Sequence, residues 1–196
     1  MAGWELPRDP LSALRAGDPA PFEEFVRCQT RTLFAFFRSR GASPTRAEDL
    51  TQEVFLKLFR SAARYRPEER FAAYCFRVAR NVWIDDCRRT GVRLDPASGR
   101  GDEQETGLEG LAGPASDPLR ELVLQEDDRR LRELLRQLPE SHRGVFELAV
   151  LGELSYPEIG SILSIPVGTV KSRMFYAVRR LRSLLADERP GEEGVA

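Results

Sequence analysis

Apolar residues recur at intervals of three and four along two stretches of the chain, residues 19–89 and 119–186. This spacing places apolar side chains on one face of a helix, and no alternating strand pattern occurs in either stretch. Residues 90–118, between them, are rich in Gly, Asp, Glu, Ser and Pro. Such a segment buries too little apolar surface to offset the entropy of ordering it. The sequence therefore predicts an all-α protein of two small helical domains joined by a flexible linker.

Charge is distributed unevenly along the 196 residues, although the net charge is only −1. Residues 90–128 contain 3 basic and 10 acidic residues, whereas residues 1–89 contain 16 basic and 12 acidic ones. Residues 129–196 are again slightly basic. This distribution favours two nucleic-acid-facing modules around an acidic spacer, although ordinary solvated surface explains charge blocks equally well.

Several classes of function have little support. No apolar run approaches the roughly 20 residues that span a bilayer, and the first ten residues do not resemble a signal peptide, so we expect a cytoplasmic protein. Three cysteines and one histidine share no metal-ligand spacing, which predicts reduced thiols, no metal and no cofactor. The chain also lacks a Gly-rich phosphate loop and a nucleophile elbow. We therefore expect no enzymatic activity.

The segment from Leu154 to Arg173 has the pattern of a helix-turn-helix. Ser155 can cap a first helix, with Glu158 completing a capping box. Gly160 lets a second helix cross closely, and Pro166 suits the start of that helix. The residues expected to face inward are Ile159, Ile162, Leu163, Val167 and Val170.

The opposite face of the second helix is basic and polar, which suits phosphates and base edges in a major groove. The alternative is an ordinary helical hairpin with a solvated basic face. The candidate DNA-contacting residues are Thr169, Lys171, Ser172, Arg173, Tyr176, Arg179 and Arg180.

A helix expected over residues 47–59 has an unusual polar face. Leu50, Val54 and Leu58 share its buried arc, so that Leu56 falls on the far side. An exposed Leu is common, but one surrounded by acidic and amide groups fits a helix that docks on a basic partner. The candidate docking residues are Asp49, Gln52, Glu53 and Leu56.

The next helix, expected over residues 69–89, has an apolar side and a mixed side. Rings and guanidinium groups stack on bases, cations bind phosphates, and an amide can read a base edge, so the mixed side suits an unstacked single strand. The alternative is that Tyr74 and Trp83 are core aromatics. Its expected core residues are Phe71, Cys75, Val78, Ala79 and Val82, and its mixed side consists of Tyr74, Arg77, Asn81, Ile84 and Arg88.

Residues 134–148, 154–159 and 166–173 resemble region four of the extracytoplasmic-function (ECF) subfamily of sigma-70-type sigma factors. Residues 47–59 and 71–89 resemble the same family's region two, and the phenylalanine-rich helix around Phe25 resembles its packing helix. Two departures are Ser164, where the turn usually has Gly, and the non-basic pair Tyr176 and Val178. A left-handed Ser164 would cost about 1 kcal/mol.

The resemblance implies a factor that directs core RNA polymerase to promoters and helps to open them. The first domain would dock on the clamp helices of the largest subunit and capture the minus-ten element, and the second would read the minus-thirty-five element. An anti-sigma factor is a further expected partner. A stand-alone regulator of duplex DNA is the alternative. The candidate minus-ten residues are Tyr65, Arg66, Tyr74, Arg77, Asn81 and Arg88.

Overall fold

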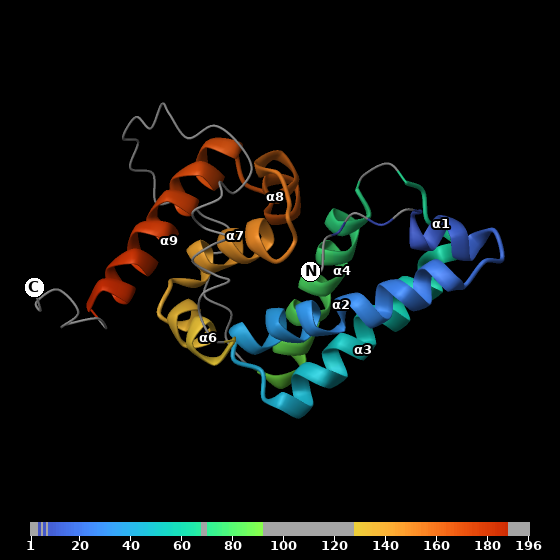
Figure 1. Ribbon diagram of the computed structural model, residues 1–196, viewed down its shortest axis with the longest axis horizontal. Coiled ribbons are helices and arrows are strands. Elements are labelled where there is room, and N and C mark those ends of the chain that lie inside the picture. Colours follow the sequence, from blue (N-terminus) through green and yellow to red (C-terminus); the bar gives the residue numbers. More distant parts are fainter. Residues whose placement is uncertain (1–3, 5, 7, 68–69, 92–127, 188–196) are drawn as a thin grey trace, which may run out of the picture.

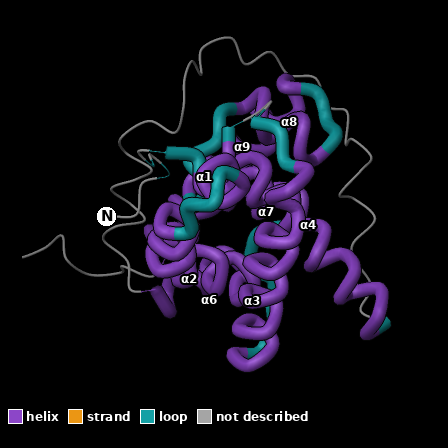
Figure 2. The backbone as a smooth tube through the Cα atoms, turned by 90° about the vertical axis from the view of Figure 1, so that its right-hand side faces the viewer, coloured by secondary structure: helices purple, strands orange, loops and turns teal. Residues whose placement is uncertain are grey.

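The computed structural model describes Trp4, Leu6 and residues 8–67, 70–91 and 128–187, and every regular element in these ranges is a helix (Figures 1 and 2). An N-terminal bundle contains α1 (Pro10–Arg15), α2 (Ala20–Ser39), α3 (Pro44–Ser61), the short 3-10 helix η1 (Ala62–Arg64) and α4 (Phe71–Thr90). A C-terminal bundle contains α6 (Asp128–Arg136), α7 (Glu140–Val150), α8 (Tyr156–Leu163) and α9 (Val167–Asp187). The all-α prediction is confirmed.

Local capping explains where several helices begin and end. The Asp9 carboxylate accepts a hydrogen bond from the Ser12 amide at 2.8 Å, and the Ser43 hydroxyl accepts one from the Arg46 amide at 3.2 Å. A proline follows each of these caps, where its missing N–H is not needed. Helix α4 ends at Thr90, just before Gly91. The φ of 69° at Gly91 is a left-handed conformation that glycine adopts without strain.

Aromatic rings fill the centre of the N-terminal bundle. Phe25 from α2 meets Phe71 from α4 edge to face at 4.8 Å, and Phe36 meets Phe76 in the same way at 5.4 Å. Edge-to-face contacts of this kind contribute beyond the area that the rings bury. Leu50, Val54 and Leu58 of α3 complete this core, as the helical spacing predicts.

The core of the C-terminal bundle is smaller and mostly aliphatic. It contains Phe146 and Leu148 of α7, Ile159 of α8 and Val170 and Met174 of α9, all at most 2% exposed. Within it, α9 packs on both α7 and α8.

The two bundles lie against each other, with α6 beside α2 and α8 beside α4 (Figure 1). Arg40 at the end of α2 forms an ion pair with Glu147 of α7. The indole N–H of Trp4 donates a hydrogen bond to the Leu151 carbonyl at 2.8 Å. The bundles thus share one continuous core across contacts that are distant in sequence.

The described residues extend the N-terminal bundle beyond the expected boundary at residue 19. Helix α1 packs on α2 and η1, and Leu11 in its first turn is fully buried. Only Thr90 and Gly91 of the expected linker lie within the described residues. Residues 119–127 of the expected second domain also lie outside them.

Candidate nucleic-acid interface

Helices α8 and α9 form the helix-turn-helix that the sequence predicts. The backbone N–H of Ser155 donates to the Glu158 carboxylate at 2.7 Å, so the capping box is present. Ser164 ends α8 in the left-handed region with φ 57° and ψ 45°, also as predicted. A Cβ on Gly160 would lie 2.9 Å from the Ile165 carbonyl oxygen. Glycine is therefore required where the turn folds back on α8.

The predicted face of α9 divides into an exposed part and a buried part. Lys171, Tyr176, Arg179 and Arg180 are exposed, whereas Thr169 and Ser172 are half-buried. The ring of Tyr176 stacks on His142 of α7, with centroids 6.0 Å apart. The exposed residues cover the half of α9 that faces away from the core, with Lys171 and Arg180 at its two edges.

Two side chains of α9 do not lie where the sequence predicts. Arg173 is only 7% exposed, because it lies three residues after Val170 and four before Ala177, both fully buried. Val167, expected to face inward, is 39% exposed at the first position of the helix. The same helical spacing, counted from Val170, would have placed Arg173 on the packed side.

The polar face of α3 has the geometry that its sequence predicts. Asp49 and Gln52 are exposed, Glu53 is half-buried, and Leu56 is 52% exposed. Phe59 is 54% exposed and was not anticipated, although it follows Leu56 by three residues and therefore shares its face. Two large apolar side chains thus lie next to acidic and amide groups on one helix.

The loop before α4 differs from expectation at Tyr65. Its side chain is 4% exposed, its hydroxyl donates to the Asp9 carboxylate at 2.7 Å, and its ring lies 5.1 Å from Tyr74. Arg15 donates to the Tyr65 carbonyl at 2.8 Å. Helix α1 and its cap therefore turn this ring into the bundle, so the Tyr65 side chain is not accessible to DNA in this structure. Arg66, next to it, is exposed.

The mixed side of α4 is accessible at its C-terminal half. Asn81 and Arg88 are exposed, while Tyr74, Arg77 and Ile84 are half-buried. Trp83 is 6% exposed, so for this residue the core alternative holds. Among the residues that the structure describes, no cluster of His, Cys, Asp or Glu could hold a metal, and no helix is long and apolar enough to cross a membrane.

Comparison with known proteins decides the family. Residues 25–93 match Sigma-70 region 2, and residues 128–181 match Sigma-70 region 4. The RNA polymerase sigma-H factor of Pseudomonas aeruginosa is 31% identical over 90% of this chain and 92% of its own length. The chain is an ECF sigma factor.

Other relatives agree with this assignment. The ECF RNA polymerase sigma factor SigE of Mycolicibacterium smegmatis is also 31% identical, over 84% of this chain and 62% of the relative. The fold matches the sigma factor RpoE, solved with the anti-sigma factor NepR from Bartonella quintana, with a TM-score of 0.61. That match has 24% identity and covers 86% of this chain and 98% of the other.

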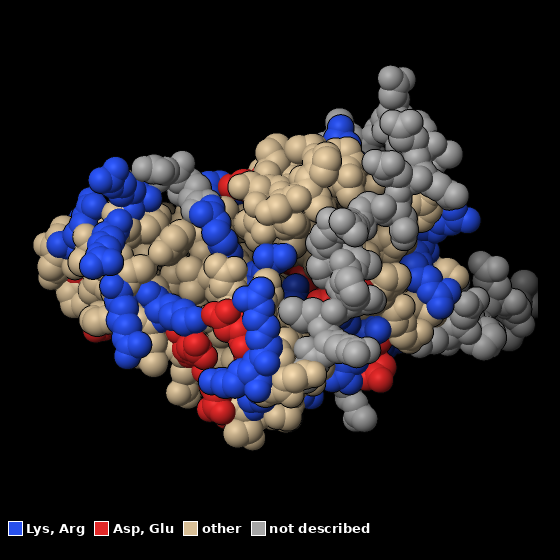
Figure 3. All heavy atoms as spheres, turned by 180° about the vertical axis from the view of Figure 1, so that it is seen from behind, with Lys and Arg blue, Asp and Glu red and all other residues tan. Residues whose placement is uncertain are grey.

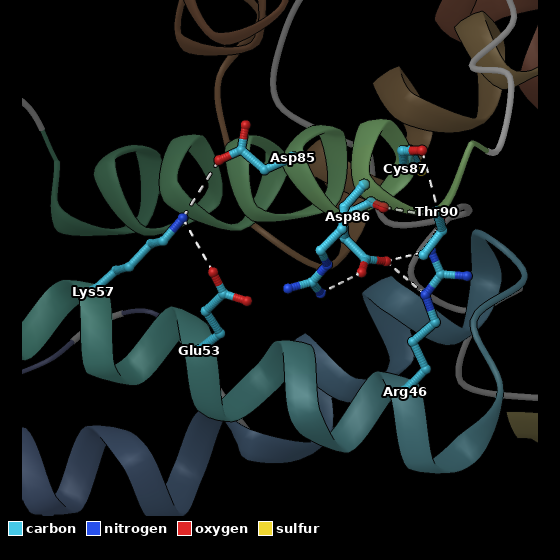
Figure 4. Close-up of polar contacts among 8 residues, drawn as sticks. Arg46, Glu53, Lys57, Asp85, Asp86, Cys87 and Thr90 are labelled. Atoms are coloured by element: carbon cyan, nitrogen blue, oxygen red, sulfur yellow. Dashed lines mark hydrogen bonds and ion pairs between the residues drawn. The ribbon is translucent and has the colours of Figure 1, made fainter.

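A polar network that includes the buried Asp86 joins α3 and α4 of this sigma factor (Figure 4). Asp86 of α4 is 4% exposed and accepts hydrogen bonds from Arg46 of α3 at 2.6 Å and from Arg89 at 2.8 Å. The hydrogen bond to Asp86 raises the pKa of Arg89. Near the other end, Lys57 of α3 bridges Glu53 and Asp85 at 3.2 and 3.5 Å. These contacts fix the polar face of α3 relative to the mixed side of α4.

Proposed function

We propose that this sigma factor attaches to core RNA polymerase through α3, captures the melted minus-ten strand with α4, and reads the minus-thirty-five duplex with α9. The observation that carries this proposal is that one chain contains two features. The first is an exposed apolar face on α3 surrounded by acidic and amide side chains, and the second is a helix-turn-helix. A stand-alone regulator needs the second feature but not the first. The work of such a protein is binding, and no catalysed reaction is proposed.

The docking face consists of Leu56 and Phe59 with Asp49, Gln52 and Glu53 around them. Large apolar side chains at the centre of an interface supply most of its binding energy, and a surrounding polar rim excludes water. Acidic groups in that rim favour a basic partner and accelerate association. The clamp helices of the polymerase's largest subunit are the proposed partner.

The minus-ten surface consists of the exposed and half-buried groups on α4 and the loop before it. Bases stack on aromatic rings with about 1–3 kcal/mol each, which offsets the energy of unstacking them from the duplex. Asn81 can read a base edge, and arginines bind the backbone. Figure 3 shows basic side chains over the end of the N-terminal bundle, consistent with a nucleic-acid surface there. The proposed residues are Arg66, Tyr74, Arg77, Asn81 and Arg88.

The minus-thirty-five surface uses the exposed side of α9. Lys171, Arg179 and Arg180 supply positive charge for phosphates, and Thr169 and Ser172 lie near the start of the helix, where base edges are usually read. Tyr176 occupies a position on this face where the family usually has a basic residue, and its ring stacks on His142. An aromatic ring here favours apolar contact, such as that with a thymine methyl group, over a phosphate contact.

We further propose an anti-sigma partner and a cytoplasmic site of action. The Bartonella RpoE structure is a complex with an anti-sigma factor, which supports a partner of the same kind here. Polymerase and promoter DNA, the proposed partners, are located in the cytoplasm. The identity of the anti-sigma factor is open to a binding screen against the full chain.

Run-off transcription tests the proposed function. Purified core polymerase is assayed with and without this protein on fragments of its own genome, including the region upstream of its gene. Transcripts with defined starts that depend on the protein support the proposal and reveal its promoter elements. If no polymerase-dependent product forms and the protein alone binds duplex DNA with sequence specificity, the regulator alternative is correct.

A further inference from the structure

The residues before the region 2 match hold the two bundles together. Trp4 is only 6% exposed, and its ring lies 6.1 Å from Phe25 and 5.2 Å from Phe76 in the N-terminal bundle. From that position its N–H donates to the carbonyl of Leu151, which follows α7. A single side chain is therefore buried by one bundle while it is hydrogen-bonded to the other.

The rest of this N-terminal arm, residues 8–17, anchors the loop before α4. The Asp9 carboxylate and the Arg15 guanidinium bind the hydroxyl and the carbonyl of Tyr65, and the adjoining Leu11 is fully buried. Farther along the same loop, Arg70 donates to the Glu153 carbonyl at 3.1 Å. The proposed minus-ten loop is thus held by the arm at one end and by the C-terminal bundle at the other.

The turn between α7 and α8 is closely fitted to the N-terminal bundle. A Cβ on Gly152 would lie 2.9 Å from Cε2 of Phe76 and 2.6 Å from the Leu148 carbonyl oxygen. Glycine lets this backbone approach the Phe76 ring. Beside this contact, the Arg40–Glu147 pair has exposed fractions of only 8% and 0%. Such a pair is stabilising only while both charges stay together, because separation in a buried site leaves an unpaired charge.

This closed arrangement cannot engage both promoter elements at once. Elements centred near minus ten and minus thirty-five are about 25 base pairs apart, which is about 85 Å of duplex at 3.4 Å per base pair. Helix α9, with 21 residues, is only about 32 Å long, and α8 lies directly against α4. The 36 residues from 92 to 127 can span about 120 Å when extended, so the chain permits separation.

We propose that the N-terminal arm and the Arg40–Glu147 pair form an intramolecular clasp that stabilises a closed state unable to span the promoter, and that opening is required before initiation. The clasp itself rests on the contacts above, and its regulatory meaning rests on the proposed function. A protein whose competent state is a minor population binds its partner more weakly by that fraction. Weakening the clasp is therefore expected to strengthen binding of the holoenzyme to a promoter that carries both elements.

Intramolecular energy transfer in the full chain tests the clasp. Cys28 on α2 is exposed and the other two cysteines are buried, so Cys28 and Ser161→Cys on α8 accept a donor and an acceptor dye. In the absence of polymerase, the labelled protein with an intact clasp is expected to give a single narrow distribution of high energy-transfer efficiency. Trp4→Ala and Glu147→Gln are expected to lower and broaden the energy transfer, and to tighten binding of the holoenzyme to a promoter fragment that carries both elements about tenfold. Glu133→Gln, which removes an exposed carboxylate paired with Arg136, is the matched control and is expected to change neither readout.

Circular dichroism separates opening from unfolding, because an open chain keeps its helical signal. If Trp4→Ala or Glu147→Gln loses that signal, Trp4→Phe decides, since it keeps an aromatic ring and removes the N–H donor together with part of the indole. Unchanged transfer in the folded variants, or broad transfer in the parent chain without polymerase, would overturn the clasp. Run-off transcription is scored separately, so a chain that opens but supports no initiation refutes the proposed function and leaves the clasp standing.

Discussion

Arg40, directly after α2, and Glu147 on α7 form an ion pair between the two bundles, although they are 107 positions apart in sequence. The Arg40 guanidinium also lies over the Phe36 ring, 3.6 Å from its centroid. Burial lowers the pKa of Arg40, and the Glu147 carboxylate opposes that effect. The second carboxylate oxygen of Glu147 has no hydrogen-bond partner among the described residues. The contacts around the pair therefore offset only part of the free energy that its removal from water costs.

We expect a double apolar replacement to keep the closed state that single replacements open. In Arg40→Met with Glu147→Leu, no unpaired charge remains in the interface, and replacing buried pairs in this way is often neutral or stabilising. Energy transfer between the bundles should stay at the parent value in the double variant and fall in Glu147→Leu alone. If the double variant opens as far as the single one, the ion pair itself is needed for closure.

Leu56→Ala is expected to weaken core polymerase binding by about 2 kcal/mol, or about 30-fold, because it removes a central apolar contact. The side chain is 52% exposed in the free protein, so the melting temperature should not change. Fluorescence anisotropy with labelled protein and core enzyme measures the affinity. Val167→Ala, an exposed aliphatic truncation on α9, is the matched control and should bind core normally. Equal effects of the two substitutions would argue against α3 as the docking helix.

Substitutions of two arginines on α9 should affect different properties, DNA affinity in one case and fold stability in the other. Arg179→Ala removes an exposed charge, so DNA affinity should fall and the slope of log affinity against log salt should decrease by about 1, with stability unchanged. Arg173→Ala removes a buried polar group and should instead destabilise the fold by about 1–3 kcal/mol. Salt titrations with minus-thirty-five duplex and thermal melts separate these outcomes. Loss of DNA affinity by Arg173→Ala without a change in stability would mean that this side chain reaches the duplex.

Ser164→Gly is expected to stabilise the helix-turn-helix by about 1 kcal/mol, because a left-handed conformation costs an L-residue that much and glycine nothing. For a chain of this length the melting temperature should rise by about 3 °C. Ser161→Gly, three residues earlier and inside α8, should lower stability by about 0.5 kcal/mol. A destabilised Ser164→Gly would show that the hydroxyl contributes more than the strain costs.

Thiol modification should distinguish the three cysteines. Burial raises the pKa of Cys75 and of Cys87, so at pH 8 both remain protonated and poorly nucleophilic, whereas Cys28 is exposed. A maleimide reagent is expected to modify one thiol rapidly in the native chain and all three in denaturant, as mass spectrometry can count. Rapid modification of Cys75 in the native chain would show that the α4 core opens readily.

Features that depend on neighbours in sequence were predictable. The helix caps, the capping box at Ser155, the left-handed Ser164 and the outward-facing Leu56 all follow from spacings of a few residues. Helical geometry repeats every 3.6 residues, so a pattern of apolar residues is enough to assign a face. The same spacing of three residues, counted from Leu56, predicts that Phe59 is exposed. Counted from Val170, it predicts that Arg173 is buried.

By itself, the sequence determined the all-α class, the two helical blocks, the helix-turn-helix and the polar face of α3 that exposes Leu56, because periodicity and capping act within a few turns of one helix. Only the tertiary structure decided that Tyr65 turns inward onto Asp9 and that Trp4 reaches Leu151, 147 residues away. Such contacts depend on how whole helices pack, and packing is set by shape and burial across the fold. The spacing of residues within one helix does not predict which distant segment a side chain will contact.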